Sequence, residues 1–211
     1  MTPPTPPFTD AARFTHIADT LADPGWCVTP DFLSGPEVQS IRAAAAALEA
    51  QGAFAPAGVG RGRDLLVRSA VRSDRVCWLD PAARDGAIGA YLARLEDLRQ
   101  ALNRDLTLGL FSFEGHLALY PPGACYRRHL DQFRGVELRT LTAILYLNPD
   151  WQPADGGTLR LYTDPDRPGH YETIAPRGGT LVSFLSARFE HEVMAAARER
   201  LSLSGWFKRR G

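Results

Sequence analysis

The sequence predicts a mainly β fold, a sandwich or barrel, with flanking helices packed on one of its sheets. Three observations support this. Short strand-like runs separated by Gly, Pro or Asp turns follow one another from about Gly115 onward. Two longer stretches with helical spacing of apolar residues precede them. The 211 residues, 45% of them hydrophobic, suit one domain with a sizeable core.

The chain is predicted to begin with an extended Pro-rich tail over residues 1–12, followed by a single domain over residues 13–211. The first part of this domain is expected to be largely helical. Phe14–Leu21 has weak helical spacing, and Trp26–Val28 resembles a short strand that ends at Pro30.

A helix is predicted to begin at Ser34 and to end near Gly52. Ser34 is a preferred N-cap, Pro36 suits the first turn, and Glu37 places an acid at the positive end of the helix dipole. A second amphipathic helix is predicted over about residues 83–103. Between the two helices we expect a loop over residues 52–62 and strands or strand edges over 65–71 and 76–79.

The helical part is expected to extend over residues 13–114 and the β core over residues 115–211. In the last predicted strand, alternation places Arg200, Ser202, Ser204 and Trp206 on one face and mainly apolar residues on the other. The expected core strands are 116–120, 138–147, 157–162, 171–174, 180–184, 192–194 and 200–207.

The charge composition disfavours nucleic-acid binding. The 24 Lys and Arg residues balance 24 Asp and Glu residues, so nothing global favours a nucleic-acid partner. A local arginine cluster is interpreted as a solvated face or, alternatively, as a contact for an acidic patch on a protein substrate. Its members are Arg61, Arg63, Arg68, Arg72 and Arg75.

The spacing of the cysteines and the length of the apolar segments indicate the cellular compartment in which the protein is expected. Cys27, Cys77 and Cys125 lack the spacing of a disulfide framework or a structural zinc site, which fits a reducing cytosol. No apolar run approaches the roughly 18 residues of a membrane span, and the N-terminus does not resemble a signal peptide. We therefore expect a cytoplasmic protein with no membrane partner.

A candidate metal site carries the strongest functional signal. His129 and Asp131 are two positions apart, and residues i and i+2 of a strand point to the same side. With His191 from another strand they would supply two imidazoles and one carboxylate, the ligand set of non-haem Fe(II) oxygenases. Arg200, nine positions after His191, could bind the carboxylate of an acidic co-substrate. A buried arginine is costly unless it is paired.

Three further histidines lack a companion at ligand spacing. His16 lies far away in sequence, His116 lies on a preceding strand, and His170 lies in a Gly/Pro-rich loop. All three are interpreted as surface residues or as residues just outside the metal ligands.

Four groups of residues carry a resemblance to a known family. They are 119–123 with 126–131, 145–151, 156–161, and 190–193 with Arg200. Together they resemble the prolyl-4-hydroxylase family of Fe(II)/2-oxoglutarate-dependent dioxygenases. The hypoxia-type (Egl-nine-like) enzymes and their bacterial relatives are the most similar branch. The resemblance covers about residues 71–207.

The resemblance implies a double-stranded β-helix (jelly-roll) core and a set of site residues. It implies His129, Asp131 and His191 as iron ligands, and Arg200 as the residue that binds the distal carboxylate of 2-oxoglutarate. It adds Tyr146, Tyr120, Ile144, Leu159 and Val193 around the co-substrate, and Trp206, Tyr126 and Arg139 toward the substrate. Residues 53–67 match the loop that closes over substrate in this family.

The implied cofactors are Fe(II), 2-oxoglutarate and O₂, with ascorbate as a further candidate. The implied activity is protein prolyl 4-hydroxylation by a monomer, coupled to succinate formation, with no catalytic group beyond the metal site. A translation factor is a candidate substrate.

Three other interpretations stay open. They are a hydroxylase of a free amino acid or other small molecule, a non-catalytic jelly-roll binding module, and a zinc hydrolase. The zinc hydrolase would need Glu190 or Glu192 as its base.

Overall fold

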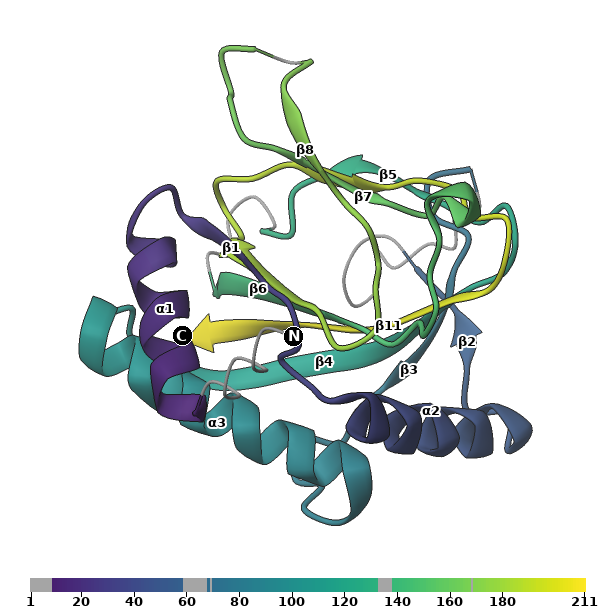
Figure 1. Cartoon of the computed structure of the whole chain (residues 1–211), viewed down its shortest axis with the longest axis horizontal. Helices are drawn as coiled ribbons and strands as arrows, with labels where there is room; N and C mark the ends of the chain where they lie inside the picture. The colour runs from purple at the N-terminus through teal and green to yellow at the C-terminus, as the bar shows by residue number, and fades with distance from the viewer. Residues whose placement is uncertain (1–8, 59–67, 69, 133–137, 168) are drawn as a thin grey trace, which may run out of the picture.

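Two antiparallel sheets face each other, and three α-helices lie along the outer side of the larger sheet (Figure 1). The computed structural model describes residues 9–58, 68, 70–132, 138–167 and 169–211. The predicted mainly β class with helices on one sheet is confirmed. Among the described residues, no helix combines the length and the apolar character needed to cross a membrane.

The helices are α1 (Asp10–Ala22), α2 (Gly35–Ala50) and α3 (Gly86–Leu106). Only α2 begins as predicted, directly after Ser34; α1 begins at Asp10, inside the predicted tail, and α3 begins at Gly86, about three residues after its predicted start. Ser34 and Glu37 form a reciprocal capping box at the start of α2, which satisfies two backbone N–H groups that the helix leaves unpaired.

The larger sheet has seven strands in the order β1-β9-β6-β11-β4-β3-β2. Long-range pairing dominates it, because β11 lies between β4 and β6 and is antiparallel to both. The strands are β1 (Trp26–Thr29), β2 (Ala55–Pro56), β3 (Arg75–Trp78), β4 (Leu110–Tyr120), β6 (Arg139–Tyr146), β9 (Leu181–Leu185) and β11 (Arg200–Arg209).

The smaller sheet has four strands in the order β5-β10-β7-β8 and lies opposite the larger one (Figure 1). A short 3₁₀ helix, Pro153–Asp155, precedes β7. The strands are β5 (Tyr126–His129), β7 (Leu159–Tyr162), β8 (Tyr171–Ile174) and β10 (His191–Val193).

Strand alternation divides the interior into two cores. On β4, Leu117 and Leu119 pack toward the helices, whereas Ala118 and Tyr120 face the space between the sheets. The same period of two separates the two faces of β6 and β11. Arg200 lies on the inter-sheet face of β11, where it lines the cavity. The next residue, Leu201, points the other way and belongs to the helix-side core.

The structure departs from the predicted elements at several positions. β4 begins at Leu110, five residues before the expected start of the β core, and a two-residue strand forms in the predicted loop. Ala70 and Val71, expected in a strand, lie in a turn. Outside the described residues lie 1–8 of the tail, Arg61 and Arg63 of the arginine cluster, and 59–67 of the proposed closing loop.

Candidate metal centre and co-substrate pocket

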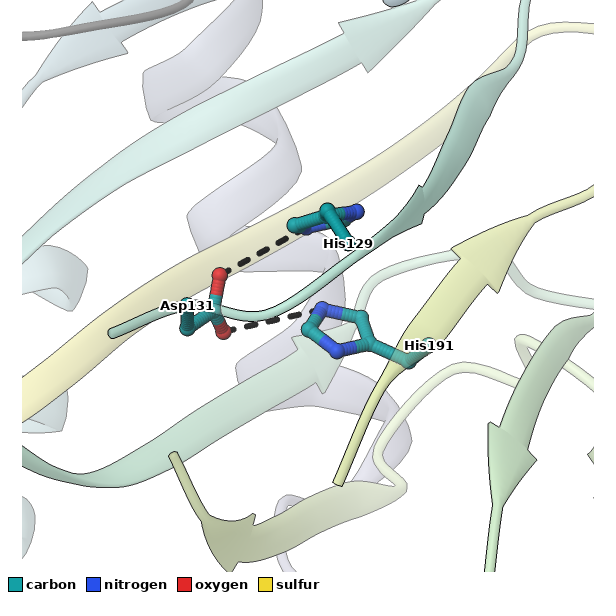
Figure 2. A group of neighbouring side chains, drawn as sticks. All are labelled: His129, Asp131 and His191. Carbon is teal, nitrogen blue, oxygen red and sulfur yellow. Dashed lines mark ion pairs between the residues drawn. The ribbon is translucent and has the colours of Figure 1, made fainter. Parts of the chain in front are cut away.

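His129, Asp131 and His191 converge on one point between the sheets (Figure 2). One ligand atom from each lies within 4.8 Å of the others. Nε2 of His129 is 3.5 Å from Oδ1 of Asp131, and Nε2 of His191 is 3.6 Å from Oδ2. The two histidines meet because β5 and β10 pair with His129 opposite His191.

Asp131 reaches this point by a route that differs from the prediction. β5 ends at His129, so Asp131 lies in a bend just beyond the strand and does not share its alternation. Its carboxylate is held from the opposite sheet, because Oγ1 of Thr142 donates to Oδ2 at 2.8 Å. Oγ of Ser186 lies 2.9 Å from the same threonine hydroxyl, which completes a buried polar chain.

Both histidines present Nε2 to the site because Nδ1 is engaged elsewhere. Nδ1 of His129 is 2.7 Å from the carbonyl oxygen of Arg127, and Nδ1 of His191 is 3.4 Å from that of Phe189. A carbonyl can only accept, so each contact favours the tautomer that leaves Nε2 with a free lone pair. Tyr126 stacks on the His129 ring at a centroid distance of 3.6 Å and limits its rotation.

The protonation states suit a divalent cation. Burial alone would raise the pKa of the Asp131 carboxyl, but the adjacent His191 and His129 lower that pKa well below its usual range. Burial lowers the pKa of His191 to about 4. At neutral pH the site therefore offers a carboxylate and a neutral imidazole, the forms that bind a metal.

A cavity of about 910 Å³ extends from this centre along the inner face of the larger sheet. Its volume is at the upper end of the range for small-molecule and cofactor pockets. The residues of β4, β6 and β11 that line it are Glu114, His116, Tyr120, Arg139, Thr142, Ile144, Arg200, Ser202, Ser204, Trp206 and Lys208.

Arg200 is a buried cation in the wall of this cavity, only 1% exposed. Its Nε donates to the carbonyl of Gly157 at 3.0 Å, and Nη1 is 3.5 Å from Oγ of Ser202. Its Cζ lies 4.9 Å from the ring centroid of Tyr120 and 5.1 Å from that of Tyr146. Within the described chain no carboxylate pairs with it. An unpaired buried charge is costly, so this guanidinium suits a bound carboxylate.

The remaining residues predicted around the co-substrate fall into two groups. Tyr120, Ile144 and Val193 line the cavity. Tyr146 and Leu159 are fully buried and are not among the described residues that line it. Burial raises the pKa of Tyr146 to about 12 although the adjacent Arg200 lowers it, and its hydroxyl makes no hydrogen bond of standard geometry with the described residues.

Three residues were predicted to contact the substrate. Arg139 and Trp206 lie toward the end of the cavity opposite Arg200, and Tyr126 lies beside the metal ligands. Arg139 lies over the indole of Trp206, with its Cζ 3.4 Å from the ring. Its Nε donates to Glu114 at 3.0 Å, and Nζ of Lys208 donates to the other oxygen of this carboxylate at 2.7 Å. Tyr126, the third residue, stacks on His129.

Comparisons with known proteins agree with this geometry. Residues 115–208 match the model of the 2OG-Fe(II) oxygenase superfamily. The crystal structure of a Pseudomonas putida prolyl-4-hydroxylase is 43% identical, with a TM-score of 0.84 over 94% of this chain and 100% of that one. This chain belongs to the 2OG-Fe(II) oxygenase superfamily. The jelly-roll prediction is thereby confirmed.

Two further prolyl hydroxylases resemble the chain over most of its length. The hypoxia-inducible factor prolyl hydroxylase of Caenorhabditis elegans is 31% identical over 203 residues, which cover 91% of this chain and 28% of that protein. A Trichoplax adhaerens prolyl hydroxylase, solved with a hypoxia-inducible factor peptide, is 26% identical with a TM-score of 0.82, over 94% of this chain and 90% of that one. The chain thus spans about a quarter of its worm relative.

The residues present fit the Fe(II), 2-oxoglutarate and O₂ that membership of this superfamily implies. Two imidazole nitrogens and one carboxylate form the expected facial ligand set. The unpaired Arg200 and the unpartnered hydroxyl of Tyr146 are the buried polar groups that a dicarboxylate would satisfy.

Several residues of this oxygenase site were missed by sequence reasoning. Thr142 carries no motif, and only the β6–β11 pairing places it beneath Asp131. For His116 the sequence left open a position at the surface or just outside the metal ligands; it is buried in the wall of the cavity that contains them. Arg72, considered only as part of a charged cluster, forms a two-bond ion pair with the buried Asp74 at 2.8 and 2.5 Å.

The two glutamates that a zinc hydrolase would need are engaged away from the cavity. Glu190 accepts from Arg128 at 2.7 Å, and Glu192 accepts from Tyr162 at 2.8 Å and Arg160 at 3.2 Å. Neither is among the described residues that line the cavity. A hydrolytic general base is therefore not apparent in the described part of the site.

Proposed function

We propose that this chain is a protein prolyl 4-hydroxylase that depends on Fe(II) and 2-oxoglutarate. The observation that carries the proposal is the presence, in one cavity, of a His-Asp-His triad and an unpaired buried Arg200. The likeness to the Pseudomonas putida prolyl-4-hydroxylase supports it over the whole length of that enzyme.

His129, Asp131 and His191 would hold Fe(II) through the atoms that already face one another. The chemistry that Fe(II) would supply there is activation of O₂, with decarboxylation of 2-oxoglutarate to succinate coupled to hydroxylation of the substrate. The protein contributes orientation: Thr142 holds the Asp131 carboxylate, and the carbonyl of Phe189 sets the tautomer of His191.

Arg200 would bind the distal carboxylate of 2-oxoglutarate. Its Nε is engaged by Gly157, so the guanidinium is already oriented before the co-substrate arrives. Tyr146 would add its unpartnered hydroxyl, and Ile144 and Val193, which line the cavity, would exclude water from it.

The substrate would enter at the end lined by Trp206 and Arg139. Two of the exposed large apolar side chains, Trp78 and Leu130, also line the cavity, which suits contact with a polypeptide. The Trichoplax prolyl hydroxylase was solved in complex with a peptide fragment of hypoxia-inducible factor, which supports a protein substrate here as well. A translation-factor target, a monomeric state, a cytoplasmic location and a role for ascorbate stay predictions.

The test is hydroxylation of peptides that contain proline, followed by mass spectrometry together with succinate release. We expect a 16 Da gain on proline that requires Fe(II), 2-oxoglutarate and O₂, and that is lost in His191→Ala. Turnover of free proline but no peptide would favour the small-molecule hydroxylase. Absence of succinate with any substrate, from folded iron-loaded protein, would favour the binding module.

Arg200 gives a separate prediction for the co-substrate. Arg200→Lys keeps the charge but loses the planar two-bond geometry, so we expect 2-oxoglutarate affinity to fall about 10- to 100-fold. The readout is anaerobic titration of the visible charge-transfer band of the iron-loaded protein. Arg198→Lys, at a position that pairs with Asp155 outside the cavity, is the matched control. Equal affinities in both variants would contradict the assignment.

A further inference from the structure

His116 is a buried polar residue of the cavity that the proposed iron and co-substrate sites do not use. It lies on the inner face of β4, is 4% exposed and lines the cavity. Its Nδ1 is buried without a hydrogen-bond partner among the described residues. Buried polar atoms are rarely left unpaired in native proteins, because the lost hydration is not replaced. The imidazole lines the cavity, so a ligand that the ring turns to meet would remove this cost.

Two tryptophans flank the imidazole. The ring centroid of Trp78 lies 4.8 Å from that of His116, and the centroid of Trp206 lies 5.5 Å away. Trp78 is the register partner of His116 on β3, and β3, β4 and β11 run side by side in Figure 1. The indole of Trp78 is 57% exposed, so this aromatic pair joins the cavity wall to the surface.

Strand register places His116 between the two ends of the cavity. Along the β4–β11 ladder, Tyr120 pairs with Arg200 at the co-substrate end, and Glu114 pairs with Trp206 at the other end. His116 pairs with Ser204, four residues from the Arg200 rung and two from the Trp206 rung. Two residues span roughly 7 Å of strand, so His116 lies nearer the substrate end.

The charge state of His116 indicates what it could bind. Burial, together with the nearby positive charge of Arg72, lowers its pKa to about 4, so the ring is neutral at physiological pH. A neutral imidazole has one donor and one acceptor, as an amide does. A charged ligand group forms stronger hydrogen bonds with a charged side chain than with a neutral one. The environment therefore suits a peptide amide.

We propose that His116 is a specificity-determining residue that hydrogen-bonds a backbone amide of the bound polypeptide, with Trp78 and Trp206 packing against the side chains on either side. The amide that follows the target proline is the expected partner, because proline's own nitrogen carries no hydrogen. This inference rests on the proposed prolyl hydroxylase function and deepens it, since a free amino acid has no such amide.

The probe is a degenerate library of blocked nine-residue peptides with a central proline, assayed for hydroxylation by the iron-loaded enzyme. We expect His116→Leu to raise KM for the library about three- to tenfold, the range of one net hydrogen bond, with little change in kcat. The affinity for 2-oxoglutarate should not change. His116→Gln, which restores a donor and an acceptor, should recover most of the loss. His16→Leu, on the exposed face of α1, is the matched control.

A second library replaces the amide after proline with an ester, which removes the N–H. The wild type should lose affinity for the ester library, and His116→Leu should show no further loss. An unchanged KM in His116→Leu, equal loss of 2-oxoglutarate affinity, or additive effects of the ester and the variant would overturn the inference. A wild type that hydroxylates no library member would overturn the proposed function, and this inference with it.

Discussion

At the scale of single residues, the site depends on groups that hold the ligands as much as on the ligands themselves. Asp131 lies beyond the end of its strand, so backbone pairing does not fix its direction. Instead, the hydroxyl of Thr142, on the facing sheet, fixes the direction of the Asp131 carboxylate through a 2.8 Å hydrogen bond. Mutation of a residue that hydrogen-bonds to a metal ligand typically lowers metal affinity about 10- to 100-fold.

Thr142→Val tests this contact. The variant keeps the shape of the side chain but removes the donor, so we expect Fe(II) affinity to fall about tenfold or more. Anaerobic metal titration measures it, with Thr142→Ser as the variant that should restore binding. Thr140→Val, on the same strand and bonded only to a backbone carbonyl, is the control. Wild-type affinity in Thr142→Val would show that Asp131 is held by other means.

His116 should make stability depend on pH. The unfolded residue binds a proton near pH 6.5, whereas burial and Arg72 lower the folded pKa to about 4. The unfolded state is therefore favoured as pH falls from 6.5 to 4, and this residue removes up to about 3 kcal/mol of stability. Urea unfolding of the metal-free protein across this range should show a smaller loss in His116→Leu. Parallel curves for the two proteins would contradict a buried neutral histidine.

At the scale of elements, β11 is central because it forms ladders with both β4 and β6. Its inner face carries Arg200 and Trp206, so one strand spans both ends of the cavity. Gly205 lies opposite Gly115 in this ladder, and the ring of Phe113 covers the pair. A side chain at Gly205 would occupy space that this ring already fills.

Gly205→Ala should disrupt the centre of the larger sheet. The added Cβ would lie 2.3 Å from Cζ of Phe113 and 2.5 Å from the carbonyl oxygen of Glu114. The backbone oxygen cannot rotate away, so we expect a loss of about 1–3 kcal/mol or more. Urea unfolding measures this loss. Gly35→Ala, where nothing lies within 4 Å, should be neutral or stabilising. Equal stability of both variants would show that the sheet relaxes around the methyl group.

At the scale of the whole molecule, the site lies between two sheets that share no strand. His129 and His191 come from the smaller sheet, whereas Thr142 and Arg200 belong to the larger one. A metal and a co-substrate bound between them would link the sheets. The helices take no part in this, because they pack on the opposite face of the larger sheet.

Ligand binding should therefore stabilise the fold. Mn(II) with 2-oxoglutarate, each at about 100 times its Kd, should add up to about 2.7 kcal/mol apiece by mass action. Thermal unfolding of the wild type should shift upward, and the shift should vanish in His191→Ala. A similar shift in that variant would mean that the ligands bind elsewhere.

The sequence alone predicted the parts of the fold that depend on short-range patterns. Ser34 and Glu37 predicted the start of α2, because a capping box is formed by residues three positions apart. Alternation along β11 placed Arg200 and Trp206 on one face, as found, because successive side chains of a strand point to opposite sides. The metal ligand set was predicted from its residue types and spacing, and the three side chains do converge.

Only the tertiary structure decided which side chains surround those ligands. Thr142 supports Asp131, and Trp78 flanks His116, because strands distant in sequence pair in a particular register. Pairing of this kind leaves no local signal, since a shift of one residue would present the other face of the strand. For the same reason the sequence left open whether His116 lies at the surface or just outside the metal ligands, and the strand pairing places it in the cavity wall. The metal ligands and Arg200 could therefore be predicted from the sequence. The side chains that surround them could not, because long-range strand register determines which ones lie there.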